Sequence, residues 1–330
     1  MIKEEREKHM KRKKIIACSI AAVLALGALT GCSVGKEQVF KINKEACSLS
    51  EAKVLLVNYQ NQYTDLYGLN LWETSEEQQG YLETYVKDLT VTKLAEVYTM
   101  ELIGEEKEIS LTEEEQAHVE AAAEEYFASL TEDEKTYMDI SIKDMEALYE
   151  RFAAAKKVYQ SLTERVDQEV SDDEARVMRA KQIFVKSQDT AKLVKQKLDA
   201  GEDFDTLAAS YSEAGKVDVA LDRSLIEKEN QDAVFALKDK QISGIIPEDD
   251  GYYIFQSVKS YDPELTEANK EKVLAGRMED AVNSTYDTYV KEARSKLNKE
   301  CWDSVKLDTS GLLKTSSLFD VFEKHCGKDF

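Results

Sequence analysis

The stretch Ala180–Tyr211 reads AKQIFVKSQDTAKLVKQKLDAGEDFDTLAASY, and the periodicity of the chain changes within it. Ala180–Val185 is rich in apolar and β-branched residues, which predicts a strand. Thr190–Leu198 and Phe204–Tyr211 carry apolar residues at helical spacing, which predicts two amphipathic helices. A mixed α/β segment therefore begins close to Ala180, whereas the chain just before it shows helical periodicity.

The rest of this segment is predicted from the same kind of pattern. Ala233–Leu237 predicts a short helix, and Ile242–Ile246 and Tyr252–Val258 predict strands on either side of an acidic turn. The predicted order is β-α-α-α-β-β. The turn, Glu248–Gly251, lacks the alternating oxygen ligands of a calcium loop, so we expect a hairpin rather than a metal site.

The flanking regions are predicted to be mainly helical. The chain has only 2 Pro and 13 Gly, so few residues would interrupt helices. The capping-box pattern, a serine or threonine followed three residues later by an acid, occurs at Ser48 with Glu51, Thr112 with Glu115, Ser141 with Asp144 and Ser171 with Glu174. We expect nearly all of residues 48–176 to be helical, and a further long helix over Thr266–Leu297. Short alternating stretches at Gln38–Asn43 and Val305–Asp308 predict strands, and a polar tail follows to Phe330.

The beginning of the chain carries the pattern of an export signal. A basic run, Lys11–Lys14, precedes the apolar stretch Ile15–Ala28, which is typical of a cleaved signal peptide. The stretch continues into Leu-Thr-Gly-Cys32, which resembles the lipoprotein signal, in which a diacylglyceryl group is attached to the cysteine. We expect residues 1–31 to be removed and Cys32 to anchor the mature chain by lipid to the bacterial cell membrane, outside the cytoplasm. The alternative is a plain N-terminal membrane anchor with an incidental cysteine.

Composition excludes several classes of protein. The net charge of −21 repels phosphate backbones, so no nucleic-acid partner is expected. The 3 His and 5 Cys show no zinc-site spacing, so we expect no metal and no cofactor. The length of 330 residues and the hydrophobic content of 42% allow two domains with cores of their own.

The segment around Ala180 resembles the parvulin family of peptidyl-prolyl isomerases. The resemblance rests on Ala180–Val185, Leu198–Phe204 with Leu207-Ala208, Tyr211-Ser212, Asp232–Leu237, Gln241–Ser243 and Gly251–Ile254. With the lipoprotein-like start and the helical flanks, the whole chain is similar to PrsA/SurA-type extracytoplasmic foldases. This resemblance implies an α+β fold, in which a mostly helical, discontinuous chaperone domain carries an inserted small parvulin-like α/β domain. The implied parts are a signal peptide over 1–31, a helical chaperone region over 32–176, the isomerase domain over 177–261, and residues 262–330, which complete the chaperone domain.

The resemblance also implies a site. Gln182 and Tyr253 stand where parvulins commonly have histidines, and Asp218 is the candidate for the acidic residue, so these three are the implied catalytic residues. The implied proline pocket consists of Ile226, Asn230 and Phe235. A polar Asn230 against a proline ring would remove part of the apolar burial that holds the substrate, on the order of 1–2 kcal/mol. The late strand Val305–Asp308 is implied to pair with the first strand.

The implied function is that of a foldase for unfolded or partly folded exported polypeptides, with peptidyl-prolyl isomerase activity that is weakened or lost. The alternative is a non-enzymatic holdase, in which the parvulin-like segment is only a binding or structural module. The many Tyr, Phe and Met residues of the helical region fit a packed core, and they also fit a groove for apolar client segments. Pairing of two copies as a homodimer stays open.

Overall fold

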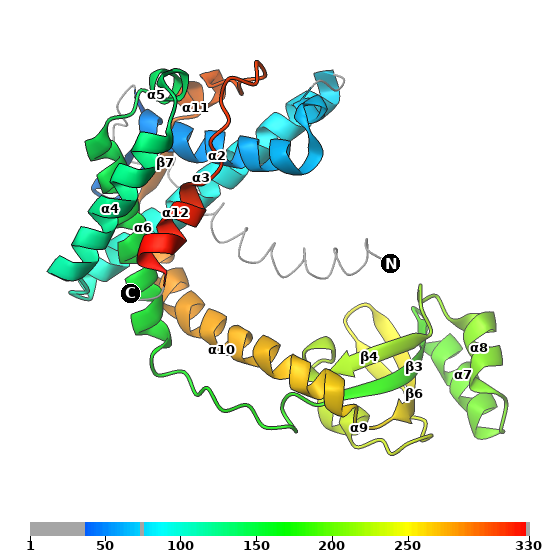
Figure 1. Cartoon of the computed structure of the whole chain (residues 1–330). Helices are drawn as coiled ribbons and strands as arrows, with labels where there is room; N and C mark the ends of the chain where they lie inside the picture. Colours follow the sequence, from blue (N-terminus) through cyan, green and yellow to red (C-terminus); the bar gives the residue numbers. More distant parts are fainter. Residues whose placement is uncertain (1–36, 73–75, 328–330) are drawn as a thin grey trace. The chain divides into compact units, whose positions relative to one another are not determined.

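The computed structural model describes residues 37–72 and 76–327 (Figure 1). Of these described residues, those up to Arg165 and those from Ala281 onward form one compact unit, here the helical unit, and Val166–Asp280 form another, the inserted unit. The fold is α+β, which confirms the expected class. The predicted signal segment 1–31 and the predicted lipid attachment at Cys32 lie outside the described residues.

Helices make up most of the described part of the helical unit. They include α2 (Leu49–Tyr67), α3 (Glu76–Glu106), α4 (Glu113–Ser129), α5 (Glu132–Met138) and α6 (Ile142–Thr163), with the 3-10 turn η1 (Leu69–Trp72) between α2 and α3. All of these α-helices except α3 begin at a capping box. The predicted boxes at Ser48, Thr112 and Ser141 are formed, with both reciprocal hydrogen bonds present in each. Thr131 with Glu134 forms a further box at the start of α5, which the sequence analysis missed.

The prediction of a helix beginning at Ser171 is wrong. Ser171 and Glu174 do form the hydrogen bonds of a capping box. Only a turn follows, because the chain enters strand β3 (Val177–Val185) almost at once. Since α6 ends at Thr163, the helical region does not continue through residue 176.

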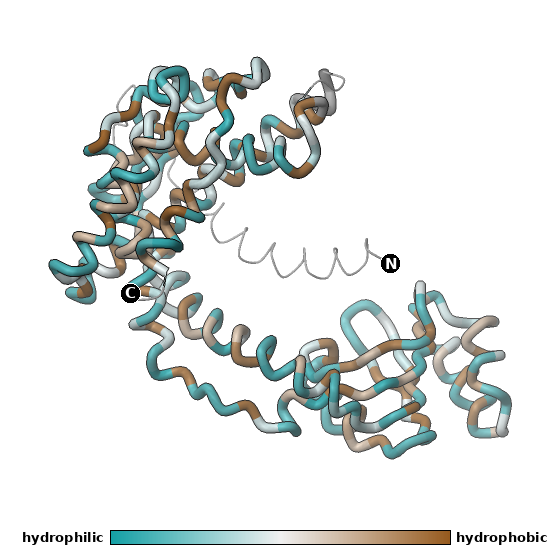
Figure 2. The backbone as a smooth tube through the Cα atoms, in the orientation of Figure 1, coloured by the Kyte–Doolittle hydropathy of each residue, from teal (hydrophilic) through white to brown (hydrophobic). Residues whose placement is uncertain are grey.

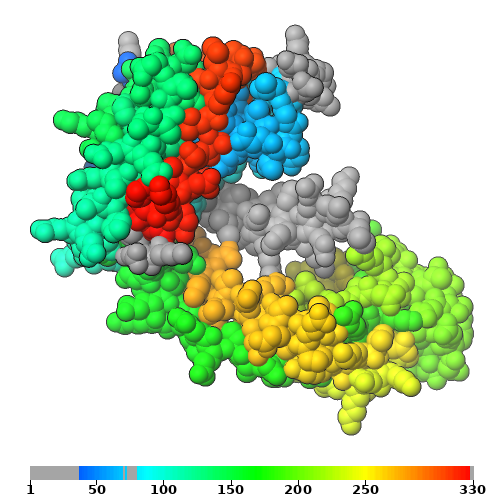
Figure 3. Space-filling model, viewed as in Figure 1, coloured from blue at the N-terminus to red at the C-terminus, as the bar shows by residue number. Residues whose placement is uncertain are grey.

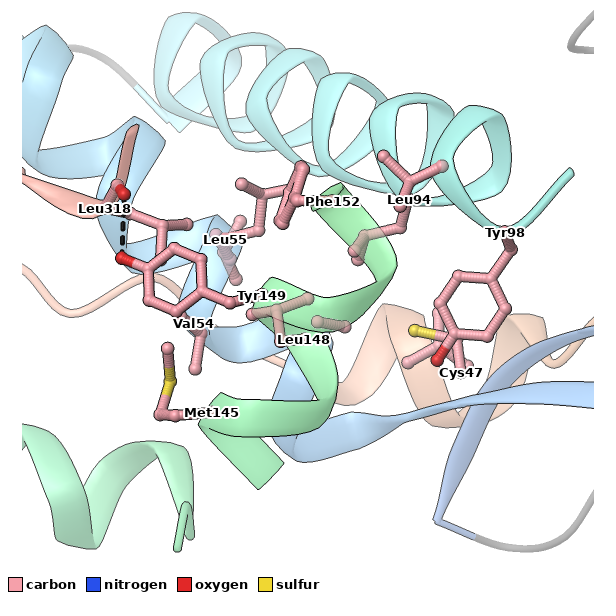
Figure 4. Packing of buried hydrophobic residues seen from close by; sticks show 14 of the residues in the cluster. Cys47, Val54, Leu55, Leu94, Tyr98, Met145, Leu148, Tyr149, Phe152 and Leu318 are labelled. Carbon is pink, nitrogen blue, oxygen red and sulfur yellow. Dashed lines mark hydrogen bonds between the residues drawn. The ribbon is translucent and has the colours of Figure 1, made fainter. Parts of the chain in front are cut away.

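One hydrophobic core holds the helical unit together, and Figure 4 shows part of it. Leu55 of α2, Leu94 of α3 and Leu148 of α6 are fully buried and belong to this cluster. The Tyr149 hydroxyl donates a hydrogen bond to the carbonyl of Leu318 at 2.8 Å, which fastens helix α12 (Leu318–Cys326) to α6. The expected polar tail is therefore wrong in part, because α12 is amphipathic and buries its apolar side.

The small sheet of the helical unit joins the part of the chain that precedes the inserted unit to the part that follows it. Its strands are β1 (Gln38–Ile42), β2 (Glu45–Ser48) and β7 (Ser295–Leu297), in the order β2-β1-β7. The expected partner of β1, Val305–Asp308, is wrong, since the antiparallel partner is β7. Helix α11 (Lys299–Ser304) follows β7, and residues 305–308 form no strand.

The inserted unit is built on an antiparallel sheet in the order β4-β3-β6-β5. Besides β3, its strands are β4 (Asp218–Asp222), β5 (Ile246–Glu248) and β6 (Gly251–Lys259), and its helices are α7 (Gln188–Asp199), α8 (Phe204–Tyr211), the 3-10 turn η2 (Arg223–Leu225) and α9 (Gln231–Phe235). Residues of α7 and α8 form a core with one face of the sheet, and residues of α9 form a core with the other face (Figure 1). Strand β4 was not predicted from the sequence. The expected hairpin over the acidic turn is confirmed, but its first strand is Ile246–Glu248 rather than Ile242–Ile246, where Ile242 makes only an isolated bridge.

Helix α10 (Pro263–Glu292) contributes to both units. Within the inserted unit, the backbone N–H of Val177 donates to Thr266 Oγ1 at 3.0 Å, and the Asn269 side chain donates to the carbonyl of Ala175 at 3.0 Å. The Arg277 guanidinium donates to backbone carbonyls of the segment that leads into β3. The start of α10 and the entry to β3 are therefore tied together as one piece.

Within the described part of the chain, no helix combines the length and hydrophobicity that a membrane crossing needs. Hydrophobic and hydrophilic residues instead alternate along the helices (Figure 2). The same residues contain no group of His, Cys, Asp and Glu that could hold a metal ion. Cys47, Cys301 and Cys326 are free thiols.

Candidate functional site

The candidate site lies on the face of the inserted sheet that α9 covers. Gln182 of β3 is directly opposite Phe255 of β6, and Phe184 is opposite Tyr253. Residues opposite one another in an antiparallel pair project to the same face, and alternate residues of a strand share a face. The structure therefore brings Gln182 and Tyr253 to one face, together with Phe184 and Phe255.

Tyr253 lies in an aromatic cluster. Its ring is stacked on Phe255 with centroids 5.6 Å apart and an interplanar angle of 10°, and it contacts Phe184 at 4.7 Å. Its hydroxyl donates to Oδ2 of Asp250 at 3.1 Å. Burial, followed by the nearby Asp250 carboxylate, raises the pKa of Tyr253 above its ordinary value, so the hydroxyl stays a neutral donor.

Gln182 is half-buried and fastens the loop between α8 and β4. Its side-chain Nε2 donates to the carbonyl of Lys216 at 3.0 Å, and its backbone N–H donates to the carbonyl of Val217 at 2.8 Å. The two residues at the family's histidine positions therefore hydrogen-bond to separate loops, Gln182 to Lys216 and Tyr253 to Asp250.

The apolar floor of this face includes two of the expected pocket residues. Ile226 is 6% exposed and Phe235 is 3% exposed, and both belong to the hydrophobic cluster that contains Phe255. The Arg223 guanidinium lies over the Phe235 ring, 5.0 Å from its centroid. Ile226 and Phe235 are thus buried members of the core on this face, and little of either side chain is exposed.

Asn230 has a structural role that its sequence position did not indicate. Its side-chain amide donates to the carbonyl of Pro247 and to Glu248 Oε1, the latter at 3.0 Å. Glu248 also accepts from the backbone N–H of Glu227 at 3.0 Å. Asn230 therefore links the start of α9 to strand β5, and its donors are satisfied within the protein rather than left against a bound proline.

Asp218 does not join the other expected catalytic residues. It begins β4 and is paired with Lys181, so it projects to the opposite face from Gln182. Lys181 there forms an ion pair with Asp205 of α8. The acid that does contact an expected site residue is Asp250, which the sequence analysis left in the hairpin turn. Its place just before Gly251 and Tyr253 was the signal that could have found it.

Gly251 is needed for the close packing of this cluster. Its φ is +151°, and a Cβ at this position would lie 2.7 Å from Phe184 Cε2 and 2.8 Å from the carbonyl oxygen of Val185. Contacts this short do not occur for a real Cβ, so a side chain here would displace β3 or the Phe184 ring. Absence of a side chain at Gly251 therefore lets Phe184 reach Tyr253.

All of these residues lie within the part of the chain, residues 153–272, that matches the PPIC-type PPIASE domain family. The chain thus contains a parvulin domain. It is 30% identical over 151 residues to foldase protein PrsA 4 of Bacillus cereus, a match that covers 41% of this chain and 53% of the relative. It is 26% identical over 307 residues to foldase protein PrsA of Caldanaerobacter subterraneus subsp. tengcongensis, covering 86% of this chain and 96% of the relative.

Solved structures of similar proteins include peptidylprolyl isomerase PrsA from Bacillus anthracis. Its TM-score is 0.41 at 18% identity, and the alignment covers 66% of this chain and 99% of that chain. The matches to the first curated relatives span about half of their length. By sequence, the chain is similar to PrsA-type foldases.

Proposed function

We propose that this chain is an extracytoplasmic foldase that binds unfolded exported polypeptides and acts on their proline-containing segments. The observation that carries the proposal is the aromatic and apolar face of the parvulin domain, where Tyr253, Phe255, Ile226 and Phe235 lie together. The similarity to PrsA-type foldases supports the same function. Residues 177–261 would serve as the isomerase domain, and residues 32–176 and 262–330 would form the chaperone domain.

The chemistry required of this face is limited. Rotation about an X–Pro bond has a barrier of about 18–20 kcal/mol, and no nucleophile or cofactor is needed to lower it. An apolar surface that holds the proline ring, together with oriented donors beside the amide, favours the twisted transition state over either planar state. Tyr253 offers a neutral hydroxyl at this face, and Gln182 offers an amide.

A holdase without turnover is the second candidate, and a specific observation favours it. The Gln182 side chain donates to Lys216 and the Tyr253 hydroxyl donates to Asp250. These two residues are therefore not joined in one hydrogen-bond network. Under this candidate the parvulin domain binds proline-containing segments without accelerating their isomerisation. The foldase and holdase candidates therefore agree on binding and differ on rate.

The experiment that separates them is exchange NMR on an apolar-X-Pro peptide with the chain added. The variants are Tyr253→Phe and Gln182→Ala, and the matched control is Tyr261→Phe, an exposed tyrosine of the inserted unit whose hydroxyl donates to Asp172 instead. Accelerated exchange that either site variant reduces, and that the control retains, supports an isomerase. Binding without acceleration supports the holdase. If the peptide neither binds nor exchanges faster, both candidates fail.

The lipid anchor is a separate part of the proposal. Labelled palmitate should be incorporated into the chain during growth, and Cys32→Ala should abolish the label and release the protein from the membrane fraction. Label retained in Cys32→Ala would contradict attachment at this residue.

A further inference from the structure

A group of aromatic and aliphatic side chains, mostly exposed, lies at one end of the helical unit. It consists of the half-buried Tyr63 and the exposed Leu66, Tyr67, Leu69, Tyr81 and Tyr85, and we call it the tyrosine tip. Tyr81 is 72% exposed, Leu66 is 73% exposed and Tyr67 is 66% exposed. Most large apolar side chains of the described residues are buried in the cores, so this clustering marks an interaction surface.

Three elements build the tip: the last turns of α2, η1, and an early part of α3. Tyr63 and Tyr67 are one helical turn apart on α2 and stack with ring centroids 6.3 Å apart. Tyr63 also meets Tyr85 of α3 edge to face at 6.1 Å, and the hydroxyl of Tyr63 donates to that of Tyr85 at 3.3 Å. Figure 1 shows this end of α2 and α3, in blue to cyan, projecting beyond the other helices of the unit.

Hydrogen bonds of buried side chains next to the tyrosine tip hold it in place. Trp72 of η1 is 2% exposed and donates through Nε1 to Thr64 Oγ1 at 2.8 Å, which fixes the turn after α2. The segment before α12 runs along α2, where Asn61 donates to the carbonyl of Thr315 at 3.0 Å. Figure 3 shows α2, in blue, at the surface beside this segment, in red to orange. The tip is therefore a firmly supported platform rather than a loose end.

The charges around the tip indicate what it binds. Residues 54–86 contain no Lys, Arg or His, although they contain five Asp or Glu residues. Of the nearby cations, Lys87 is buried with its amine on the carbonyl of Val305, and Lys306 is paired with Glu83 at 3.4 Å. Lys314 is exposed on the segment that runs along α2. Exposed tyrosine rings attract cations through their faces while offering apolar area. A second copy of this chain would bring the same net charge of −21, which opposes self-association.

We propose that the tyrosine tip docks apolar, positively charged segments of unfolded polypeptides. This inference rests on the proposed foldase function and assigns its client recognition to a surface of the helical unit, apart from the parvulin site. Apolar residues of the client pack on Leu66, Leu69 and the rings, and its Lys or Arg side chains lie over the tyrosine faces.

The test is a fluorescence anisotropy titration of the whole chain with two labelled peptides. One peptide alternates Leu and Phe with Lys, and the other has Glu in place of every Lys. The variant combines Tyr67→Ser with Tyr81→Ser, which removes two exposed rings without touching the core. Tyr159→Ser is the matched control, because Tyr159 is 42% exposed elsewhere on the same unit.

We expect the Lys peptide to bind and the Glu peptide to bind at least about tenfold more weakly, because the rings and the acidic chain both favour cations. The double variant should lose about tenfold in affinity for the Lys peptide, since two cation-binding faces are removed. The Tyr159→Ser variant should bind like the unchanged chain. Circular dichroism should show that all three proteins are equally folded.

Some outcomes would overturn the proposal. Equal affinity for the two peptides, or unchanged affinity in the double variant, would exclude the tip as a cationic docking surface. Sedimentation that shows a dimer split by the double variant would assign the tip to a second copy instead.

Suppression of the aggregation of an unfolded client protein is measured with the same variants. If the double variant still suppresses aggregation, only the docking proposal fails; if the unchanged chain does not suppress it, the foldase proposal fails too.

Discussion

The hydroxyl of Tyr253 donates a hydrogen bond to Asp250 at 3.1 Å, so the strand β6 and the hairpin turn that precedes it are joined by a side-chain pair. The ring of the same tyrosine stacks on Phe255 and also contacts Phe184, whose ring is tilted by 39°. The Tyr253 hydroxyl is therefore a neutral hydrogen-bond donor at the edge of an apolar face. A histidine, which parvulins commonly have at this position, would be a donor that titrates near neutral pH.

The first prediction concerns pH. The His residues of this chain, His9, His118 and His325, all lie outside the inserted unit, and Tyr253 has a raised pKa. A tyrosine whose folded pKa is raised stays protonated below about pH 10, and its contribution to stability is lost only as the pH rises further. Exchange or binding of an X-Pro peptide should therefore show no histidine step between about pH 6 and pH 8. A step there in the NMR exchange rate would contradict this assignment.

The second prediction compares two glycines. Gly251→Ala would force a Cβ against Phe184 and the backbone of Val185, and we expect a loss of about 1–3 kcal/mol in the free energy of unfolding. Gly276→Ala, in α10, meets nothing within 4 Å and should stabilise by about 0.5–1 kcal/mol, because alanine favours the helix. Urea unfolding of both variants measures the two signs. Equal effects would show that Gly251 has no packing role.

The third prediction concerns Arg151 of α6, whose guanidinium meets carboxylates from β2, α2 and α3. Its partners are Glu45 at 3.3 Å, Glu51 at 3.5 Å and Glu101, and it lies 4.2 Å from the centroid of the Tyr98 ring. Arg151→Met would leave these acids without their cation, and we expect a loss of about 3–5 kcal/mol in the free energy of unfolding.

The control for Arg151 is Lys195→Met, which removes an ion pair with Asp199 on the surface of α7. Exposed pairs of this kind contribute little, so the change should stay within about 0.5 kcal/mol. Unfolding monitored by circular dichroism provides both values. Similar losses in the two variants would mean that the cluster around Arg151 is not a structural centre.

The fourth prediction follows from Glu101. Burial is the main cause that raises its pKa to about 7, against the opposing effect of Arg151. The pKa of Glu101 is higher in the folded chain than in the unfolded chain, so ionisation of this carboxyl favours the unfolded chain. The free energy of unfolding therefore falls as the pH rises from about 4.5 to 7. Glu101→Gln cannot ionise, so its stability relative to the unchanged chain should improve by about 1–3 kcal/mol between pH 5 and pH 8. Urea unfolding at a series of pH values measures this difference. If the free energies of unfolding of the two proteins change in parallel between pH 5 and pH 8, the raised pKa of Glu101 is contradicted.

Local signals predicted much of the fold. Capping boxes at Ser48, Thr112 and Ser141 located three helix starts, because the reciprocal hydrogen bonds depend on neighbouring residues only. The same pattern at Ser171 failed, since the strand that follows is held by long-range pairing with β6. Strand β4 was missed because Asp218 and Asp222 flank a very short apolar stretch whose partner, β3, lies far away in sequence.

Register explains what could not be predicted at the site. Gln182 and Tyr253 share a face because β3 and β6 pair in a particular alignment, and Asp218 is excluded from it by the pairing of β4 with Lys181. A list of residue types cannot reveal such alignments. The role of Asn230 was equally hidden, since its partner carbonyl on Pro247 comes from the strand after α9.

The pairing of β1 with β7 has a consequence for the order in which this chain can acquire its structure during secretion. A polypeptide that emerges from the N-terminus onward exposes Gln38–Ile42 first, yet Ser295–Leu297 becomes available only near the end. The whole sequence of the inserted unit, Val166–Asp280, has emerged before that moment. We expect the parvulin domain to be the first part to mature, while the helical unit waits, incomplete, for its last strand.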